Sequence, residues 1–106
     1  MAYGTALQAL ADPTRRLVFD RLRAGPLSVA ALSDGLPVSR PAVSQHLKVL
    51  KEAGLVADDA LGTRRVYRID RDGLASLRAW LDRFWDDALD AYQAEIQHQI
   101  DERKNT

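Results

Sequence analysis

The chain has 106 residues, 46 % of them hydrophobic, and contains no cysteine. This length suits one domain, and the lack of cysteine excludes disulfides and thiolate metal sites. Its 15 basic and 15 acidic side chains cancel, but residues 1–71 carry a balance of +4 and residues 72–106 a balance of −4. This asymmetry predicts one surface for a polyanion and one region kept away from it.

The apolar runs and the N-terminus bear on the compartment. No apolar run approaches the roughly 20 residues of a membrane span. The N-terminus lacks the basic-then-apolar pattern of a signal peptide. We therefore expect a soluble, cytoplasmic protein without membrane contact.

Two helices are predicted near the start of the chain. Residues 6–11 predict a short helix with Leu7 and Leu10 on one side. Asp12 is a suitable N-cap, and Pro13 a suitable first residue, for a second helix over residues 14–23.

A third and a fourth helix follow, with a tight connection between them. Ser28 can cap a helix over residues 29–33, and residues 34–38 form the connection. Ser39 can cap the fourth helix, and Gly54 can end it in the left-handed conformation that helix ends often need. Two short helices joined in this way have the form of a helix-turn-helix, which spans residues 28–54.

The fourth helix has two different faces. Val43, Leu47 and Leu50 recur at three- and four-residue spacing, so they share a face that should meet a core. At about 100° per residue, the opposite face carries small, amide and cationic groups. These are Arg40, Pro41, Ser44, Gln45, Lys48 and Lys51. Such groups suit base edges and phosphates, and the alternative is an ordinary solvated helix face.

A β-hairpin is predicted over residues 55–69, with its tip near residues 61–63. The second half alternates in polarity and is rich in β-branched and aromatic types, and Gly62 supplies the turn. Three of its side chains are cations: Arg64, Arg65 and Arg68. A hairpin directly after a recognition helix is a wing, and the alternative is a plain exposed hairpin with solvated arginines.

A long helix is predicted over residues 74–100, after a turn at residues 70–73. Its apolar side chains step by three or four: Leu74, Leu77, Leu81, Phe84, Ala88, Tyr92, Ile96 and Ile100. Trp80, Trp85 and Leu89 widen this stripe beyond what one small domain needs, so we expect a partner to cover it. The alternative is that both tryptophans fill the core of the monomer. The polar tail, residues 101–106, is expected to fray.

These motifs resemble those of the ArsR-type winged-helix transcriptional regulators. Residues 10–16 (Leu-Ala-Asp-Pro-Thr-Arg-Arg) resemble the opening motif of that family. Residues 39–50 with residues 53–56 resemble its recognition helix and exit, and residues 62–67 resemble its wing. The resemblance implies a single winged helix-turn-helix domain over residues 1–106, mainly α with a small β-hairpin. It also implies a homodimer through the first and last helices that binds palindromic operators, usually as a repressor.

Many members of this family release DNA on binding a metal, and here the sequence departs from them. The family's thiolate motif in the third helix corresponds to residues 27–32, which contain no cysteine. A second family site on the last helix finds only a poor echo in Asp87, His98 and Asp101. We therefore expect no metal and no cofactor, and the effector cannot be inherited from the resemblance.

The resulting hypothesis is a sequence-specific, DNA-binding transcriptional regulator that represses as a homodimer on a double-stranded operator. The candidate DNA contacts are Ser39, Arg40, Ser44, Gln45, His46, Lys48, Lys51, Arg64 and Arg65. The candidate dimer interface is Leu7, Leu10, Trp80, Phe84, Leu89 and Tyr92. Among the DNA contacts, three are assigned to base edges: Arg40, Ser44 and Gln45.

The other candidates are assigned to the DNA backbone. The Ser39 hydroxyl and the helix N-terminus would meet phosphates. Four cations would neutralise phosphates or enter the minor groove: Lys48, Lys51, Arg64 and Arg65. His46 lies on the flank of the face, where it would contact a phosphate or pack half-buried against the wing.

Two other classes of function compete with this hypothesis. The zero net charge would suit a winged-helix module for protein–protein contact that has lost DNA binding. An enzyme is not expected, because no nucleophile–base or phosphate-binding constellation is present. Asp58 and Asp59 form a carboxylate pair, but solvation in an exposed hairpin is the simpler account.

Overall fold

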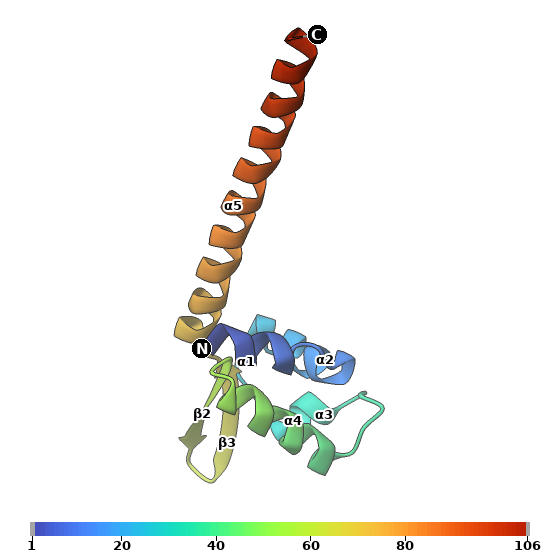
Figure 1. Cartoon of the computed structure of the whole chain (residues 1–106). Coiled ribbons are helices and arrows are strands. Elements are labelled where there is room, and N and C mark those ends of the chain that lie inside the picture. Colours follow the sequence, from blue (N-terminus) through green and yellow to red (C-terminus); the bar gives the residue numbers. More distant parts are fainter. Residues whose placement is uncertain (1, 106) are drawn as a thin grey trace.

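The computed structural model describes residues 2–105 and is mainly helical. Its elements are α1 (Ala2–Ala9), α2 (Pro13–Arg21), the 3₁₀ turn η1 (Leu22–Ala24), β1 (Leu27–Ser28), α3 (Val29–Ser33), α4 (Arg40–Glu52), β2 (Val56–Leu61), β3 (Arg64–Ile69) and α5 (Arg71–Lys104). In Figure 1, α1–α4 and the β2–β3 hairpin gather at one end, and α5 projects away from them. The first helix thus begins and ends earlier than the predicted residues 6–11, and the second ends in a 3₁₀ turn rather than continuing to residue 23.

The core forms where the apolar face of α4 meets α2 and α3. Val43, Leu47 and Leu50 are completely buried, as the spacing predicts, and they pack with Val18 of α2 and Leu32 of α3. Burial of one such leucine is worth about 1.5–3 kcal/mol. This packing fixes which face of α4 remains exposed.

Short polar side chains begin the helices of this domain, as predicted. The Asp12 carboxylate accepts a hydrogen bond from the Arg15 backbone N–H at 3.0 Å. The Ser39 hydroxyl accepts one from the Ala42 backbone N–H at 3.2 Å, which leaves the start of α4 ordered and exposed. These bonds satisfy helix-end donors that otherwise have no partner.

The end of α4 is closed by Gly54, as predicted, with φ at 79°. Two backbone bonds complete the closure: Leu55 N–H donates to the Leu50 carbonyl, and Gly54 N–H donates to the Lys51 carbonyl. This is the pattern of a Schellman motif, which satisfies the last carbonyls of the helix. The chain then turns directly into β2.

The hairpin runs antiparallel, with Val56 opposite Ile69 and Leu61 opposite Arg64. Gly62, at φ 63°, makes the turn at the predicted tip. The sequence analysis missed β1, which pairs antiparallel with β3 and gives the strand order β1-β3-β2. Two residues are too few to show an alternating pattern, so only the fold reveals this strand. It ties the middle of β3 to the start of α3.

The last helix is longer than predicted at both ends. It starts at Arg71 rather than residue 74, because the Asp70 carboxylate accepts hydrogen bonds from the N–H groups of Asp72 and Gly73. Gly73 lies in the first helical turn, where an added Cβ would sit 1.6 Å from the Gly54 carbonyl oxygen. Only glycine lets α5 pass so close to the end of α4. The prediction that residues 101–106 fray is also wrong within the described residues, since the helix continues to Lys104.

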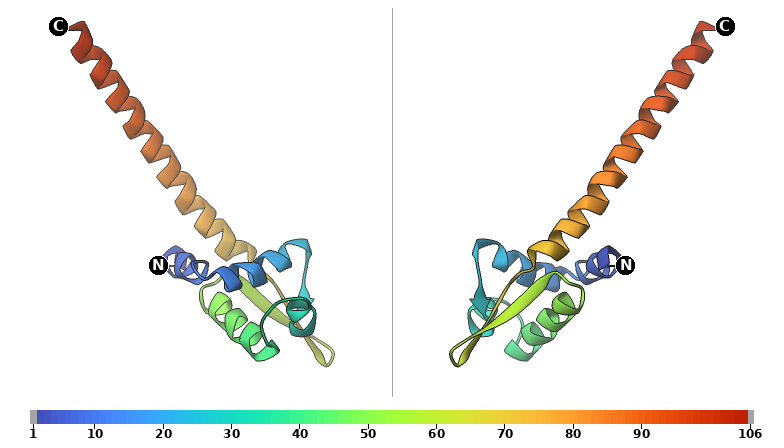
Figure 2. Two further views of the ribbon diagram at one scale, coloured as in Figure 1. Left: turned by 90° about the vertical axis from the view of Figure 1, so that its right-hand side faces the viewer. Right: turned by 90° about the vertical axis from the view of Figure 1, so that its left-hand side faces the viewer.

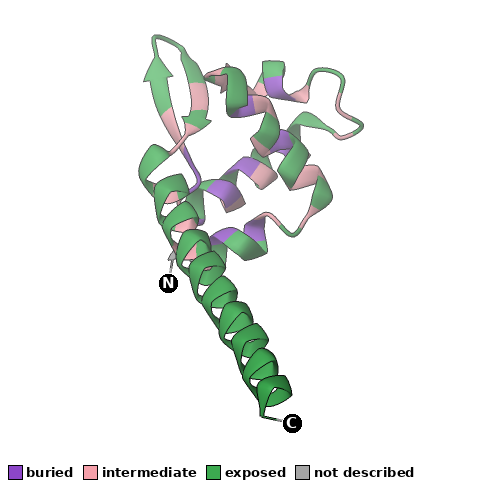
Figure 3. Cartoon of the chain, turned by 90° about the horizontal axis from the view of Figure 1, so that it is seen from above, coloured by how far each residue is buried: buried purple, intermediate pink, exposed green. Residues whose placement is uncertain are grey.

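From Leu81 onward, every described residue of α5 is exposed (Figure 3). The first turns contact α1, and Leu77 packs against the core. The rest extends alone, which gives the chain dimensions of 74 × 27 × 23 Å (Figure 2). Within residues 2–105, no helix has the length and apolar character to cross a membrane.

Candidate nucleic-acid interface

The outer face of α4 is a continuous polar surface. Because its inner face is packed on α2 and α3, the side chains of Arg40, Ser44, Gln45, Lys48 and Lys51 are left exposed. They combine hydrogen-bonding and cationic groups along one side of a helix that is capped and fixed at both ends. Such a helix can enter the major groove of DNA with its side chains toward the base edges.

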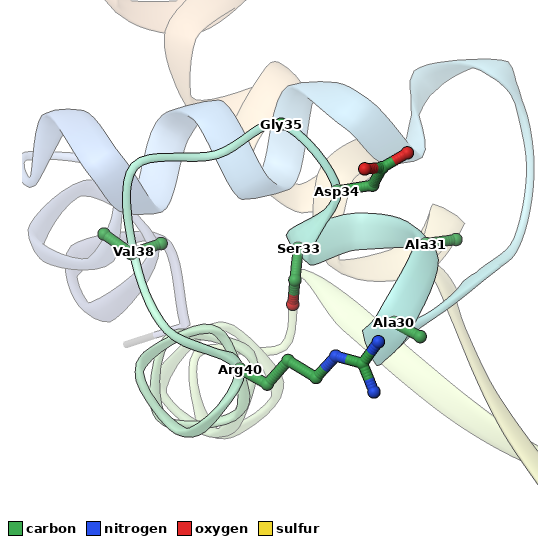
Figure 4. Close-up of a pocket in the computed structure, with 7 residues that line it drawn as sticks. All are labelled: Ala30, Ala31, Ser33, Asp34, Gly35, Val38 and Arg40. Carbon is green, nitrogen blue, oxygen red and sulfur yellow. The ribbon is translucent and has the colours of Figure 1, made fainter.

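The start of α4 borders an open hollow in front of α3 and the connecting turn. In Figure 4 the Arg40 side chain extends from α4 toward Ala30 at the start of α3, whereas the Asp34 carboxylate points away from it. Arg40 is therefore free to reach outward along the front of the helix-turn-helix.

Arg21 holds the turn of the helix-turn-helix in place, a role that the sequence analysis missed. Its Nη1 donates to the Asp34 carbonyl and, at 3.4 Å, to the Leu32 carbonyl. The next residue, Gly35, adopts φ 76°. Helical periodicity does not predict such a contact, because Arg21 reaches from α2 to residues 11 and 13 positions further along the chain.

The hairpin places its basic side chains on two faces. Arg65 lies on the same face of β3 as Tyr67, whereas Arg64 and Arg68 lie on the other. Arg64 and Arg65 are both exposed and follow the tip directly. The hairpin therefore presents cations near its tip beside the exit of α4.

Asp58 joins α4 to the hairpin. Its Oδ1 lies 2.7 Å from Lys51 Nζ at the end of α4, and its Oδ2 accepts a hydrogen bond from Arg65 Nη1 of β3. The Asp58 side chain is only 7 % exposed. The hydrogen bonds from Lys51 and then Arg65 lower the pKa of this carboxyl below its ordinary value. The expectation of a solvated Asp58 is thus wrong; its place across from Tyr67 and diagonal to Arg65 was the available signal.

The opposite face of the hairpin has its own, more exposed ion pair. Arg68 Nε lies 2.9 Å from Asp59 Oδ2, and both side chains are close to half exposed. The hydrogen bond to Asp59 raises the pKa of Arg68. Within residues 2–105, no ion pair within 4 Å involves Arg40, Lys48 or Arg64. These three are the cations of the surface without a bound carboxylate.

His46 differs from the other candidate DNA contacts because it is half-buried. The pKa of Asp12, at the start of α2, is lowered first by the hydrogen bond from the Arg15 backbone N–H, and His46 adds a smaller contribution. Its Nδ1 is buried without a hydrogen-bond partner among the described residues. The structure thus places His46 toward α2, at the flank of the surface.

Comparisons with known proteins agree with this geometry. A family model described as "Helix-turn-helix domain" matches residues 10–59. The chain is 60 % identical over 97 residues to the HTH-type transcriptional regulator Rv2034 of Mycobacterium tuberculosis, covering 92 % of this chain and 91 % of that one. It also resembles an ArsR-like transcriptional regulator from Rhodococcus sp. RHA1, with TM-score 0.74 and 32 % identity over 85 % of this chain and 88 % of that one.

A further solved structure is the homodimeric winged helix-turn-helix DNA-binding domain Mb0332 from Mycobacterium bovis, described as a possible ArsR-family regulator. Its TM-score is 0.65 at 30 % identity, covering 85 % of this chain and 83 % of that one. The chain belongs to the ArsR family of transcriptional regulators. Other relatives carry the name transcriptional repressor.

The candidate metal ligands of this ArsR-family member all lie on α5: Asp87, His98 and Asp101. Within the described residues, no group of three or more His, Cys, Asp or Glu side chains is placed to hold a metal ion. His98 Nε2 lies 3.0 Å from Glu102 Oε1, one helical turn away, and both side chains are about two-thirds exposed. Asp101 accepts a hydrogen bond from Gln97 instead.

The candidate dimer residues of this ArsR-family member divide into two groups. Leu10 and Trp80 are half-buried, and Leu10 packs against the core. Four are exposed: Leu7, Phe84, Leu89 and Tyr92. Trp80 and Phe84 stack with their ring centroids 5.8 Å apart, so one ring near the domain continues into the exposed stripe.

Proposed function

We propose that this ArsR-family protein is a dimeric repressor that binds a palindromic DNA operator with α4 and the β2–β3 hairpin. One observation carries the proposal: the exposed face of α4 continues into the basic hairpin, and Arg40, Lys48 and Arg64 have no paired carboxylate among the described residues. The zero net charge is no obstacle, because the acidic excess lies in residues 72–106. Acting on DNA, the protein is expected in the cytoplasm.

Within this proposal, α4 lies in the major groove. The Ser39 end meets a phosphate, because helix N-termini favour anions. Arg40, Ser44 and Gln45 reach base edges, where arginine suits guanine and glutamine suits adenine. Lys48 and Lys51 lie toward the backbone, as do Arg64 and Arg65 of the hairpin, while His46 has a flanking role.

The second element of the proposal is dimerisation through α1 and α5. The exposed stripe on α5 includes Leu81, Trp85, Leu89, Tyr92, Ile96 and Ile100. Trp85 and Ile96 are eleven residues apart, as are Leu81 and Tyr92, a spacing that keeps a stripe on one side of a long helix. An exposed apolar stripe of this length is typical of a protein–protein interface. A second copy would cover it and set two α4 helices about 34 Å apart, for successive major grooves.

Selection from a randomised DNA library tests the proposal. The wild-type protein should first retard a random 30-base-pair duplex at low salt. Repeated selection should then enrich an inverted repeat with its half-sites about one helical turn apart. A protein that retards no duplex at low salt would overturn the proposal and leave a protein-interaction module as the remaining hypothesis. Enrichment of a single, unrepeated half-site would overturn the dimeric part alone.

A further inference from the structure

Asp58 makes contacts that a solvated hairpin residue would not make. It lies on β2, and its two carboxylate oxygens are taken by cations from two different elements, Lys51 of α4 and Arg65 of β3. The carboxylate is 7 % exposed, whereas Lys51 and Arg65 are 54 % and 58 % exposed. The two cations therefore cover the carboxylate and keep their own outer surfaces in solvent.

This arrangement changes what the basic surface offers to DNA. Two cations and one carboxylate act together as a single positive charge at the junction of α4 and the hairpin. Each cation must also give up a hydrogen bond to Asp58 before it can bind a phosphate fully. Nonspecific DNA binding depends on the number of phosphates that a protein neutralises. A carboxylate placed here therefore lowers that number.

We propose that Asp58 is a positioning residue that holds Lys51 and Arg65 on the protein and so restricts nonspecific binding to DNA. The inference rests on the proposed function. It adds that Asp58 limits the number of phosphate contacts that the protein makes with DNA of arbitrary sequence. Lys48 and Arg64, which have no carboxylate partner among residues 2–105, supply the phosphate contacts on arbitrary sequence. The same contacts join the end of α4 to the hairpin, so the spacing between the two DNA-contacting elements depends on Asp58.

The neighbouring residue supplies a matched control. Asp59 lies one position further along β2, pairs with Arg68 on the opposite face, and is 48 % exposed. Asp58→Asn and Asp59→Asn change the net charge by the same amount, at consecutive positions of β2. Only Asp58→Asn releases two cations beside α4. A difference between the variants thus reports the contacts rather than the overall charge.

The experiment measures binding to a random-sequence 30-base-pair duplex as a function of salt. Compared with the wild type, Asp58→Asn should bind about five- to tenfold more tightly at low salt. Its slope of log K against log salt should be steeper by about 1–2 units, one for each released cation. Asp59→Asn should change the slope by less than half as much. Equal effects of the two variants, or no effect of Asp58→Asn, would overturn the inference.

A second set of variants keeps the test decisive if Asp58→Asn does not fold. With Asp58 intact, Lys51→Gln should reduce the salt slope clearly less than Lys48→Gln, because Lys51 is held by the carboxylate. Equal reductions would overturn the inference. In a folded Lys51→Gln/Arg65→Gln background, adding Asp58→Asn should leave the slope unchanged, and a steeper slope there would also contradict it. If the wild type binds no duplex, the proposed function itself fails, which is a different result.

Discussion

Leu47 and Leu89 both lie on apolar helical stripes, yet Leu47 is fully buried and Leu89 is 40 % exposed. The stripe of α4 finds its partners within the chain, in α2, α3 and the base of the hairpin. The stripe of α5 beyond Trp80 has no partner outside α5 among the described residues. The same helical pattern therefore encodes a core in one region and, we propose, an interface between subunits in the other.

The core stripe should give the largest effect on folding. Leu47→Ala removes a completely buried side chain and leaves a cavity, so it should lower the free energy of unfolding by about 2–5 kcal/mol. Leu81→Ala, at a 53 % exposed position, is the matched control. Denaturant unfolding at low protein concentration, where dimers are sparse, should show little change for it. Equal losses would abolish the distinction between the two regions.

The exposed apolar stripe of α5 should give the largest effect on assembly. Leu89→Glu places a charge in the proposed interface, so dimerisation should weaken by about 3 kcal/mol, or roughly a hundredfold. Specific DNA binding should fall with it, because one half-site contact is weak alone. Sedimentation and a binding titration measure the two effects. A monomeric variant that keeps full operator affinity would contradict the interface, whereas Asp90→Glu should behave as the wild type.

We expect base recognition to depend on α4 and not on the exposed part of α5. Gln45→Ala should relax the preference at one or two positions in each half-site, at a cost of about 1–3 kcal/mol each. The thermal stability of the Gln45→Ala variant should equal that of the wild type, because Gln45 is exposed. Selection from a randomised library shows the preference directly. A uniform loss on all sequences would instead make Gln45 a backbone contact.

The hairpin arginines should contribute unequally. Arg64 has no paired carboxylate within residues 2–105, whereas Arg65 donates a hydrogen bond to Asp58. Arg64→Ala should make the slope of log K against log salt shallower by about 0.9 units, and Arg65→Ala by less. Salt titrations of the two single variants on one duplex provide the measurement. No change for Arg64→Ala would remove the hairpin from the DNA contact.

The pH dependence of stability should be the smallest effect. The folded protein lowers the pKa of Asp58, chiefly through the hydrogen bonds from Lys51 and Arg65. The unfolded chain therefore binds the proton more readily, and the stabilisation is present above the unfolded pKa of about 3.9 and lost as pH falls through the lower folded pKa. The difference in Tm between wild type and Asp58→Asn should accordingly shrink below pH 4. A difference independent of pH between 2 and 6 would contradict the ion pairs.

Local chemistry explains what could be predicted from the sequence. The caps at Asp12 and Ser39 and the closure at Gly54 depend on neighbours three to five residues away, so their residue types suffice. The buried stripe of α4 follows from periodicity alone. The winged helix-turn-helix was therefore predictable, and the family comparison agrees with it.

Distant contacts explain what could not be predicted. Strand β1 exists because Leu27 meets Tyr67, forty residues further along the chain. The start of α5 depends on the Asp70 cap and on Gly73 passing the Gly54 carbonyl. The burial of the Asp58 carboxylate involves an ion pair with Lys51, which belongs to α4 and not to the hairpin. Each of these needs the tertiary arrangement that brings separated segments together.

We propose that DNA binds to the outer face of α4 and to the hairpin, while the exposed part of α5, from Leu81 onward, serves assembly. Backbone amide NMR of the labelled protein, titrated with a selected operator duplex, tests this directly. We predict that large shift changes fall in residues 39–51 and 61–65, and that residues 90–104 remain unchanged. Changes concentrated in residues 90–104, with α4 unaffected, would contradict the account.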